Sequence, residues 1–299
     1  MKKQNILIIG LGNIGNKRLK IILKNKCYNK IYLFDKIKIN KKLKKTKVLT
    51  SFDLFEIKKL NIDLAILSVN PKFSYRYAKV LLNIGVNILV EKPPSFKFDQ
   101  FKELYNLSLK KRKYLFVGFN FLYDPAVQLI KKELKNIGTL YKIDMSYLYG
   151  TTLTNINKVG AYMDVGLHLV SIIIYILGNF KIIHANFLNF EKKYKYYDED
   201  GFILLKKGGS SITLRFSLIN WINKFYFKAI GKKGMIELSG LSKWKNQELK
   251  VYKRVYPSGY PKILKKISFK KDVSFEREIK YILNKISNRK FDSSENKKY

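Results

Sequence analysis

Residues 5–35 read NILIIGLGNIGNKRLKIILKNKCYNKIYLFD: an apolar run, a glycine-rich turn, a helical pattern and a second apolar run. The first run, 6–9, predicts a buried strand, and Ile14, Leu19 and Ile22 after the glycines approximate helical spacing. The second predicted strand ends at Asp35, twenty positions past the last glycine. A strand, tight turn, helix and strand with an acid at this distance are typical of a dinucleotide-binding unit.

Three glycines, Gly10, Gly12 and Gly15, have separate tasks in this interpretation. Gly10 permits the turn, and Gly12 lets the backbone approach a pyrophosphate because no Cβ intervenes. Gly15 lets the helix pack closely on the strand, and the free N–H groups at the helix start face the anion. A GxGxxG pattern alone is a weak signal, but the flanking strands and Asp35 support it.

The acid also bears on the choice of cofactor. A carboxylate at Asp35 that accepts hydrogen bonds from the ribose hydroxyls would repel the extra phosphate of NADP, so NAD is favoured. NADP stays open as an alternative because four lysines just beyond the acid are able to hold a 2′-phosphate, although a solvated loop is the plainer interpretation. These lysines are Lys36, Lys38, Lys41 and Lys42.

Composition indicates a globular protein of two domains. The chain has 299 residues, of which 46% are hydrophobic, and it lacks an apolar stretch of signal-peptide or membrane-spanning length. The single cysteine, Cys27, has no partner for an internal disulfide and no neighbouring metal ligand, so we expect a reducing, cytoplasmic setting and no metal site.

The net charge is unusual: 60 Lys and Arg against 22 Asp and Glu give a formal +38. Such a charge alone suggests a nucleic-acid partner. The lysines are, however, spread along the whole chain rather than gathered in a tail, so we expect neither nucleic-acid binding nor membrane insertion. A positive field would instead attract anionic cofactors and anionic substrates such as nucleotide sugars.

Strand and helix patterns alternate through residues 1–118, which we assign to a Rossmann domain. This alternation predicts a doubly wound, mostly parallel sheet with right-handed crossovers. Beyond the first unit, strands are predicted at 63–69, 86–90 and 114–117, and helices at 54–59, 73–83 and 98–111.

The rhythm changes in residues 119–299, which we assign to a second, α+β domain with a large, open, mostly antiparallel sheet. Helices should cover one face of this sheet and a second copy of the chain the other, in a homodimer or homotetramer. Strands are predicted at 139–149, 181–190, 201–206, 210–218, 225–230 and 235–238, and helices at 125–134, 162–177 and 274–286.

Several motifs along nearly the whole chain resemble those of the Gfo/Idh/MocA family of NAD(P)-dependent oxidoreductases. They are the segments 10–15 (GLGNIG), 91–93 (EKP), 117–120 (VGFN) with Pro125, 160–168 (GAYMDVGLH) and the hairpin 229–238. The resemblance implies a Rossmann domain followed by a substrate-binding α/β domain. The cofactor-binding residues that we expect are Gly10, Gly12, Asn13, Ile14, Gly15, Asp35, Ser68, Asn70, Glu91 and Lys92.

The candidate catalytic residues are Lys92, Asp164 and His168. Hydride transfer from a secondary alcohol needs a base for the hydroxyl proton and a donor to the developing carbonyl oxygen. Lys92 follows a predicted parallel strand, where open α/β sheets place ligands, and histidine exchanges protons near neutral pH. Asp164 lies four residues before His168, one helical turn away, and would orient its imidazole. The plainer interpretation of each alone is a surface residue or a helix pair.

Lys92, Asp164, His168 and Asn120 are also the expected substrate contacts, with a turn cap as the alternative role for Asn120. The other histidine, His184, lacks such a context and is interpreted as structural. Two departures from the family pattern leave the substrate contacts open: Phe73-Ser74-Tyr75 replaces a frequent histidine, and Ser171 replaces a frequent aspartate.

We also predict a cis peptide bond at Lys92-Pro93 or Pro93-Pro94, because only X-Pro bonds adopt cis at low cost; the resemblance favours the first. The leading functional hypothesis is an oxidoreductase acting on a sugar, an inositol or a nucleotide-linked sugar. The rival class is an NAD(H)-binding sensor or scaffold. Reduction of a non-sugar such as a bilin or a diol, or cofactor-assisted glycoside cleavage, is a second enzymatic alternative.

Overall fold

The computed structural model describes residues 3–37, 45–150, 159–190, 197–288 and 290–296. The chain divides into two compact units, one of Met1–Phe119 with Phe275–Tyr299 and the other of Asn120–Ser274. The sequence-based boundary placed all of 119–299 in the second domain. The structure differs because the closing helix packs in the core of the first unit.

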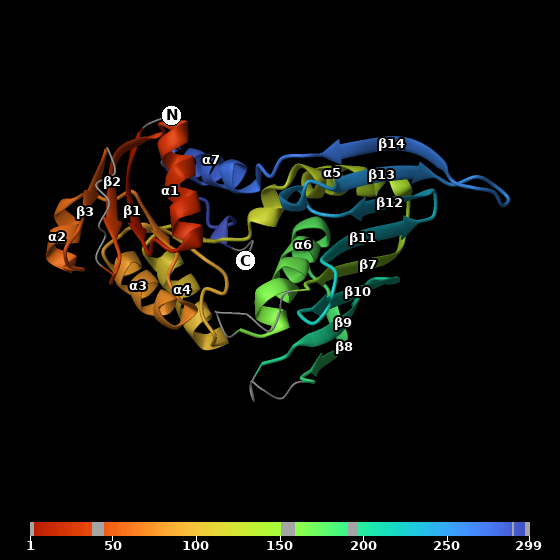
Figure 1. The fold of residues 1–299 in the computed structure, drawn as a ribbon, viewed down its shortest axis with the longest axis horizontal. Coiled ribbons are helices and arrows are strands. Elements are labelled where there is room, and N and C mark those ends of the chain that lie inside the picture. The colour runs from red at the N-terminus through yellow and green to blue at the C-terminus, as the bar shows by residue number, and fades with distance from the viewer. Residues whose placement is uncertain (1–2, 38–44, 151–158, 191–196, 289, 297–299) are drawn as a thin grey trace. The chain divides into compact units, whose positions relative to one another are not determined.

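The first unit contains a six-stranded parallel sheet, as the alternating pattern predicted (Figure 1). Its strand order, β3-β2-β1-β4-β5-β6, is that of dinucleotide-binding folds. The strands are β1 Gln4–Ile9, β2 Tyr28–Phe34, β3 Thr46–Val48, β4 Leu64–Leu67, β5 Asn87–Val90 and β6 Leu115–Val117. The helices are α1 Asn13–Asn25, α2 Leu54–Lys59, α3 Pro71–Asn83, α4 Phe98–Lys110 and α7 Ser274–Ser287.

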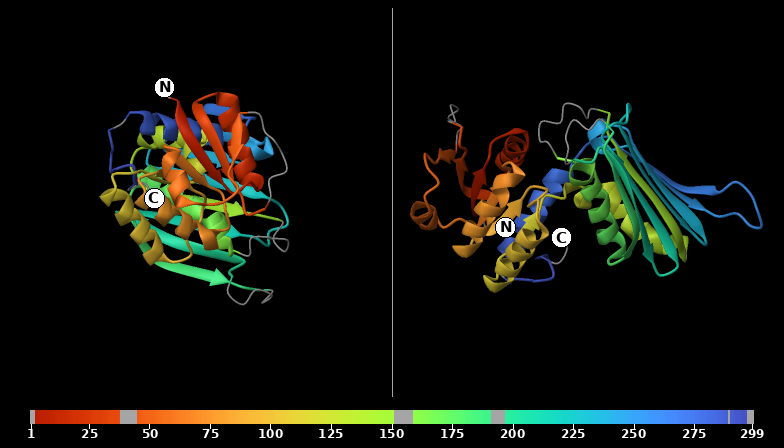
Figure 2. Two further views of the ribbon diagram at one scale, coloured as in Figure 1. Left: turned by 90° about the vertical axis from the view of Figure 1, so that its left-hand side faces the viewer. Right: turned by 90° about the horizontal axis from the view of Figure 1, so that it is seen from below.

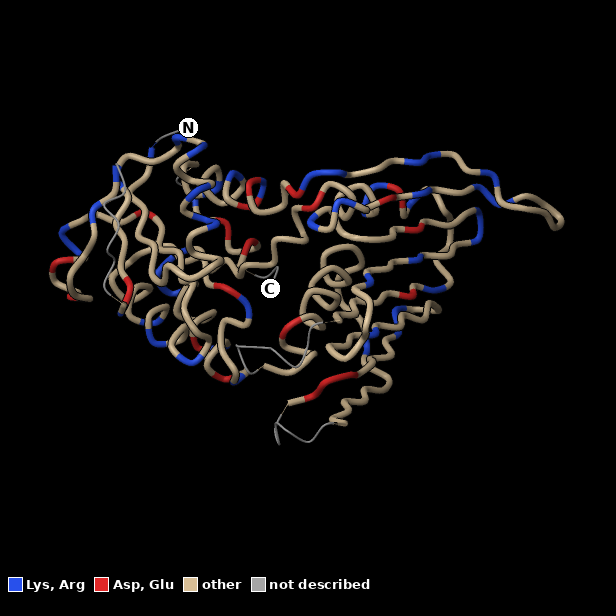
Figure 3. The backbone as a smooth tube through the Cα atoms, in the orientation of Figure 1, with Lys and Arg blue, Asp and Glu red and all other residues tan. Residues whose placement is uncertain are grey.

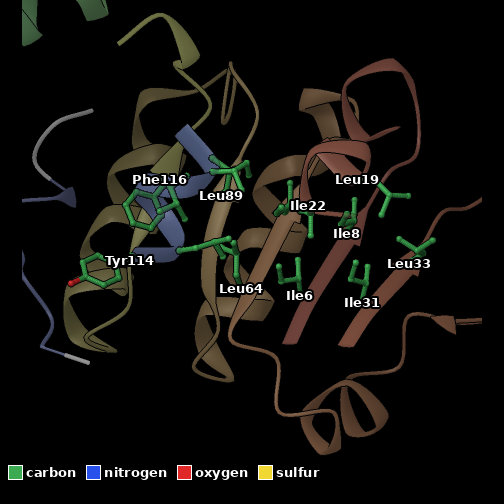
Figure 4. Packing of buried hydrophobic residues seen from close by; sticks show 14 residues of the cluster. Ile6, Ile8, Leu19, Ile22, Ile31, Leu33, Leu64, Leu89, Tyr114 and Phe116 are labelled. Atoms are coloured by element: carbon green, nitrogen blue, oxygen red, sulfur yellow. The ribbon is translucent and has the colours of Figure 1, made fainter. Parts of the chain in front are cut away.

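Both faces of this parallel sheet are buried, which explains why its strands appear in the sequence as continuous apolar runs. One face packs against α1 and α7 through a cluster of buried aliphatic and aromatic side chains (Figure 4). From the sheet this cluster includes Ile6, Ile8, Ile31, Leu33, Leu64, Ile66, Leu89 and Phe116, with Tyr114 directly before β6; from the helices, Leu19, Ile22, Ile279, Ile282 and Leu283. The last helix is therefore an integral part of the Rossmann core.

The second unit contains an eight-stranded sheet of order β14-β13-β12-β11-β7-β10-β9-β8 (Figures 1 and 2). Among the described strands of this second sheet, only β10 and β7 pair in parallel, which confirms a mostly antiparallel sheet. The strands are β7 Leu140–Leu148, β8 Lys181–Leu188, β9 Asp200–Lys207, β10 Ser210–Ser217, β11 Lys224–Gly231, β12 Gly234–Ser239, β13 Gln247–Lys253 and β14 Lys262–Phe269. Sequence reasoning missed β13 and β14.

Helices α5, Pro125–Glu133, and α6, Leu167–Leu177, cover one face of the eight-stranded sheet (Figure 2). Alternate residues of β7, such as Ile143, Met145 and Tyr147, are buried on that face. Burial alternates in the same way along β10 and β11, so each strand presents its other residues to the opposite, outer face.

The outer face mixes charged, tyrosine and apolar side chains. A row of charges crosses five neighbouring strands, with Lys228 opposite both Asp144 and Glu237, and Lys250 opposite both Glu237 and Lys266. Lys228 Nζ lies 3.2 Å from Glu237 Oε1, and Tyr252 donates a 2.9 Å hydrogen bond to Glu237 Oε2. Half-buried apolar residues share this face: Phe202, Leu204, Ile230 and Met235.

We predict that this outer face mediates homo-oligomerisation, because a monomer would leave its apolar and aromatic side chains in water. Sedimentation at micromolar concentration is expected to show a dimer or tetramer. Replacing Leu204 by Lys should shift the distribution toward monomer, whereas Lys206→Met on the same strand should not. A monodisperse wild-type monomer would contradict the prediction.

Lysine and arginine positions are spread along the backbone of both units rather than gathered on one element (Figure 3). Within the described part of the chain no helix is both long and apolar enough to cross a membrane.

Candidate active site

The glycine-rich turn between β1 and α1 has the geometry of a phosphate cradle. Gly10 has a φ of +88°, and a Cβ there would overlap the carbonyl oxygen of Ser68. A Cβ at Gly15 would overlap the carbonyl oxygen of Gly10, whereas at Gly12 no atom of the described chain lies within 4 Å. Helix α1 starts at Asn13, followed by Ile14, without a side-chain cap or an acidic first turn. Its first N–H groups therefore remain for an anion.

Asp35 stands where β2 ends and supports the glycine turn. One carboxylate oxygen accepts a 2.6 Å hydrogen bond from the Leu11 N–H and the other a 3.0 Å bond from the Ile37 N–H. Each oxygen retains acceptor capacity for a ribose hydroxyl. Lys36 stacks over Phe73, 4.4 Å from its ring centroid, while Lys38, Lys41 and Lys42 lie outside the described residues.

Two of the expected cofactor contacts follow β4. The hydroxyl of Ser68 is buried and has no hydrogen-bond partner among the described residues, so it is suited to an added ligand. The side chain of Asn70 instead caps α3, where its oxygen accepts a 3.0 Å hydrogen bond from Lys72 N. Sequence reasoning did not foresee this local role.

The segment 91–94 follows β5, and its Lys92-Pro93 peptide bond is cis, as predicted. Lys92 is half-buried. The neighbouring Glu91, expected to contact the cofactor, is hydrogen-bonded and ion-paired to Nε of Arg18. Its carboxylate thus has an internal partner that the sequence did not reveal.

Arg18 is completely buried and connects two acids. Its Nη1 lies 2.8 Å from Oε2 of Glu278 on α7, while its Nε contacts Glu91. Burial raises the pKa of Glu278 to about 7, because Arg18 lowers it only in part and the charge of Glu91 opposes ionisation. One guanidinium is thus shared by two carboxylates, and one of them, Glu91, directly precedes Lys92.

In the second unit, the segment 160–168 begins the helical path toward α6. Residues Tyr162–Gly166 form a π-helical turn, η4, which contains Asp164, and His168 follows on α6. Sequence reasoning expected regular α-helical spacing between these two residues. Asp198 fixes the start of the turn, because its carboxylate accepts a 2.6 Å hydrogen bond from Tyr162 N. Burial raises the pKa of Asp198.

His168 is 7% exposed and packs among aromatic rings. Its ring stacks on Phe121 with centroids 4.5 Å apart, and Tyr147 lies 6.1 Å away. Burial, followed by the charges of Tyr149 and Asp164, raises the pKa of Tyr147 well above its ordinary value. Asp164 is therefore close enough to influence the same aromatic group electrostatically.

Asn120 begins the short helix η1, Asn120–Tyr123, and is 5% exposed. Its side-chain nitrogen donates a 2.7 Å hydrogen bond to Ser274 Oγ. Ser171, which replaces the aspartate frequent in the family pattern, donates a 2.8 Å hydrogen bond from its hydroxyl to the carbonyl of His168. The other histidine, His184, is exposed on β8 beside Phe202. The first unit thus gathers the expected cofactor residues at the ends of its parallel strands, and the second gathers Asp164, His168 and their aromatic neighbours.

Residues 4–119 match the family model described as oxidoreductase family, NAD-binding Rossmann fold. Residues 4–119 therefore form an NAD-binding Rossmann domain of the Gfo/Idh/MocA oxidoreductase family. D-glucoside 3-dehydrogenase of Escherichia coli K12 is 24% identical over 131 residues, which cover 40% of this chain and 37% of that protein. The matched segment thus spans little more than a third of this curated relative.

Similar folds extend over the whole chain. The crystal structure of the oxidoreductase YhhX has a TM-score of 0.81 at 18% identity, covering 99% of this chain and 94% of its own. The 3-ketoreductase KijD10 of Actinomadura kijaniata, in complex with NADP and TDP-benzene, has a TM-score of 0.81 at 13% identity, with 99% and 94% covered. At these identities the likeness establishes the two-domain fold.

Proposed function

We propose that the protein is an NAD(P)-dependent oxidoreductase that transfers hydride between the nicotinamide and a hydroxyl or keto carbon of a sugar, an inositol or a nucleotide-linked sugar. The observation that carries the proposal is the cradle of Gly10, Gly12 and Gly15 beside Asp35 in a domain of this family. The similarity to D-glucoside 3-dehydrogenase and to a 3-ketoreductase supports a sugar-like substrate.

The residues present fit a dinucleotide. The open space at Gly12 and the uncapped start of α1 suit a pyrophosphate, and Asp35 suits the adenosine ribose. We infer that Ser68 and Asn70, which follow β4, border the cofactor at the carboxyl ends of the parallel strands. The bound cofactor supplies or accepts the hydride.

The proton chemistry falls to the chain's own residues. In this proposal His168 takes the proton of the reacting hydroxyl, Lys92 donates a hydrogen bond to the developing carbonyl oxygen, and Asp164 orients the imidazole. His168 is only 7% exposed, and the rings of Phe121 and Tyr147 pack against its imidazole. Asn120 is inferred to contact the substrate through the oxygen of its amide, whose nitrogen bonds to Ser274.

Turnover assays with a panel of sugars test this proposal. NAD or NADP is offered with glucose, glucuronate, myo-inositol and UDP-glucose, and the absorbance of the reduced cofactor is followed. Reduction of cofactor by at least one sugar-like compound is the expected result. Tight NADH binding without turnover on any of these compounds, or on a diol and a bilin assayed in the same way, would instead favour the alternative of a sensor or scaffold.

The cofactor preference follows from the charge of Asp35. In Asp35→Asn the side-chain oxygen still accepts from Leu11 N, but the charge that repels a 2′-phosphate is gone. We expect the ratio of NADH to NADPH affinity to fall about tenfold, equivalent to about 1.4 kcal/mol, with kcat at saturating cofactor unchanged.

Fluorescence titration with both reduced cofactors measures this ratio. Asp35→Ala serves as the comparison, because it also removes the acceptor of the Leu11 N–H hydrogen bond and should lower the affinity for both cofactors. An unchanged ratio in Asp35→Asn would show that this carboxylate does not discriminate between them.

A further inference from the structure

A second lysine stands in the aromatic surroundings of the candidate base. Lys243 lies on the short helix η5, Ser242–Trp244, and its Nζ donates hydrogen bonds of 2.7 Å to the Tyr147 hydroxyl and 2.8 Å to the Tyr149 hydroxyl. The ammonium is also 4.9 Å from the ring centroid of Tyr149 and 5.2 Å from that of Trp244. Rings and hydroxyls thus hold this cation in one place.

These partners orient the ammonium without neutralising it. Within the described ranges of the chain, no carboxylate forms an ion pair with Lys243, whereas many other lysines do. An ammonium has three N–H donors, and the two tyrosine hydroxyls occupy two of them. One donor and the full positive charge therefore remain for an anion.

Lys243 shares its aromatic neighbours with His168. Phe121 stacks on the imidazole at 4.5 Å and also lies 6.0 Å from the ammonium. Tyr147 accepts the hydrogen bond from Lys243 and contacts the imidazole ring at 6.1 Å. The cation and the candidate base therefore share two aromatic neighbours.

A buried acid fixes η5 in this position. Asp124, which is 3% exposed, accepts hydrogen bonds from Ser242 Oγ at 3.2 Å and from Gln247 Nε2 at 3.3 Å, on either side of Lys243. It also accepts a 2.8 Å bond from Ala126 N at the start of α5. The loop that carries Lys243 is thus joined to the segment that carries Phe121, which preorganises the cation.

We propose that Lys243, Tyr149 and Trp244 form a subsite for an anionic group, a carboxylate or a phosphate, on a sugar-like substrate whose reacting carbon lies at His168. In this subsite the ammonium pairs with the anion, and the Tyr149 hydroxyl donates a hydrogen bond to it. The half-buried Trp244 ring packs against the sugar. The inference rests on the proposed function through the role of His168.

Equilibrium binding to the NADH-loaded protein tests the subsite separately from catalysis. The probes are glucose, glucuronate and glucose 6-phosphate, which differ in the substituent at one carbon, and titration calorimetry measures each Kd. We expect the wild type to bind one of the two anionic sugars more tightly than glucose. The preferred probe identifies the anion as a carboxylate or a phosphate.

Lys243→Met should raise the Kd of the preferred anionic probe by roughly tenfold to a hundredfold, the range for a hydrogen bond to a charged group. The Kd of glucose should change by less than about twofold. Lys243→Arg should restore most of the affinity because it restores the charge. Lys206→Met, which removes an exposed lysine of β9, is the control for net charge and should have no effect.

Three results would overturn the subsite: no anionic preference in the wild type, equal losses for glucose and the anionic sugar in Lys243→Met, or an equal loss in Lys206→Met. If anion binding depends on Lys243 but no sugar is oxidised, the subsite is supported and the proposed function is contradicted.

Discussion

Replacing His168 by Ala is expected to lower kcat by about 10²–10⁴ while the affinity for NADH stays nearly unchanged. The imidazole is proposed to take the substrate proton, and it belongs to the second unit, whereas the glycine cradle belongs to the first. The measurement is steady-state turnover on the best substrate of the panel, with a parallel NADH titration.

The control is His184→Ala, which removes the exposed histidine of β8 and should leave turnover nearly unchanged. Lys92→Ala should reduce kcat as strongly as His168→Ala, and Asp164→Asn should reduce it less because it orients rather than transfers. Should His168→Ala keep full activity, the proton-transfer assignment is wrong, and Lys92 or a water molecule would act as the base.

Replacing Arg18 by Met is expected to cost about 3–5 kcal/mol in the free energy of unfolding, because it leaves a buried carboxylate without its cation. Glu278 is 0% exposed and depends on Nη1 of Arg18 at 2.8 Å, and Glu91 depends on Nε. Urea denaturation measures the change. Lys24→Ala is the matched control, since Lys24 pairs with Glu276 between the same two helices at 3.8 Å but is exposed, and it should cost less than about 1 kcal/mol.

The same cluster predicts a dependence of stability on pH. The pKa of Glu278 is raised to about 7 in the folded protein, against an ordinary value of 4.5, so the folded state binds this proton more tightly than the unfolded chain. Its contribution to stability is complete below about pH 4.5 and is lost as the pH rises through about 7. Arg18, Glu91 and Lys17 are the charges that act on this group.

Glu278→Gln removes this titration. The difference in unfolding free energy between wild type and variant should therefore change between about pH 4.5 and 7, in the direction of a relatively weaker wild type at higher pH. A difference that is constant over this range would show that Glu278 does not titrate there.

For the Arg18→Met experiment, a loss of unfolding free energy no larger than that of Lys24→Ala would show that the cluster is not essential for stability.

The Rossmann sheet could be predicted because its strands are buried on both faces and appear as unbroken apolar runs. β14 could not be predicted, because nearly all of its residues are exposed and it alternates lysines with apolar residues irregularly. The helical spacing of Asp164 and His168 predicted a helix but could not distinguish its π-helical turn from regular α-helix. Local patterns of hydrophobicity therefore predict whether a segment is a helix or a strand more reliably than they predict which other elements it pairs with.

The functional residues that sequence reasoning missed depend on contacts between distant segments. Arg18 resembles any basic residue of an amphipathic helix, and its partner Glu278 follows 260 positions later. Tyr147 in β7 and Tyr149 just after its end have a spacing of two, which predicts side chains on the same side of an extended segment and was a usable signal. Their cation Lys243, however, is one of 60 basic residues and is distinguished only by its place in the fold.

The position of α7 determines when the first unit can finish folding during synthesis. Gln4 near the start of the chain donates a 2.9 Å hydrogen bond to the carbonyl of Leu283, and Ile279 and Ile282 fill the core beside β1. A ribosome that has released only the first 119 residues has therefore delivered a sheet with one face incompletely covered. The second unit, Asn120–Ser274, is continuous in sequence and emerges complete while the nucleotide domain still waits for its final helix. The nascent chain is thus expected to fold its later half first and to close its earlier half last.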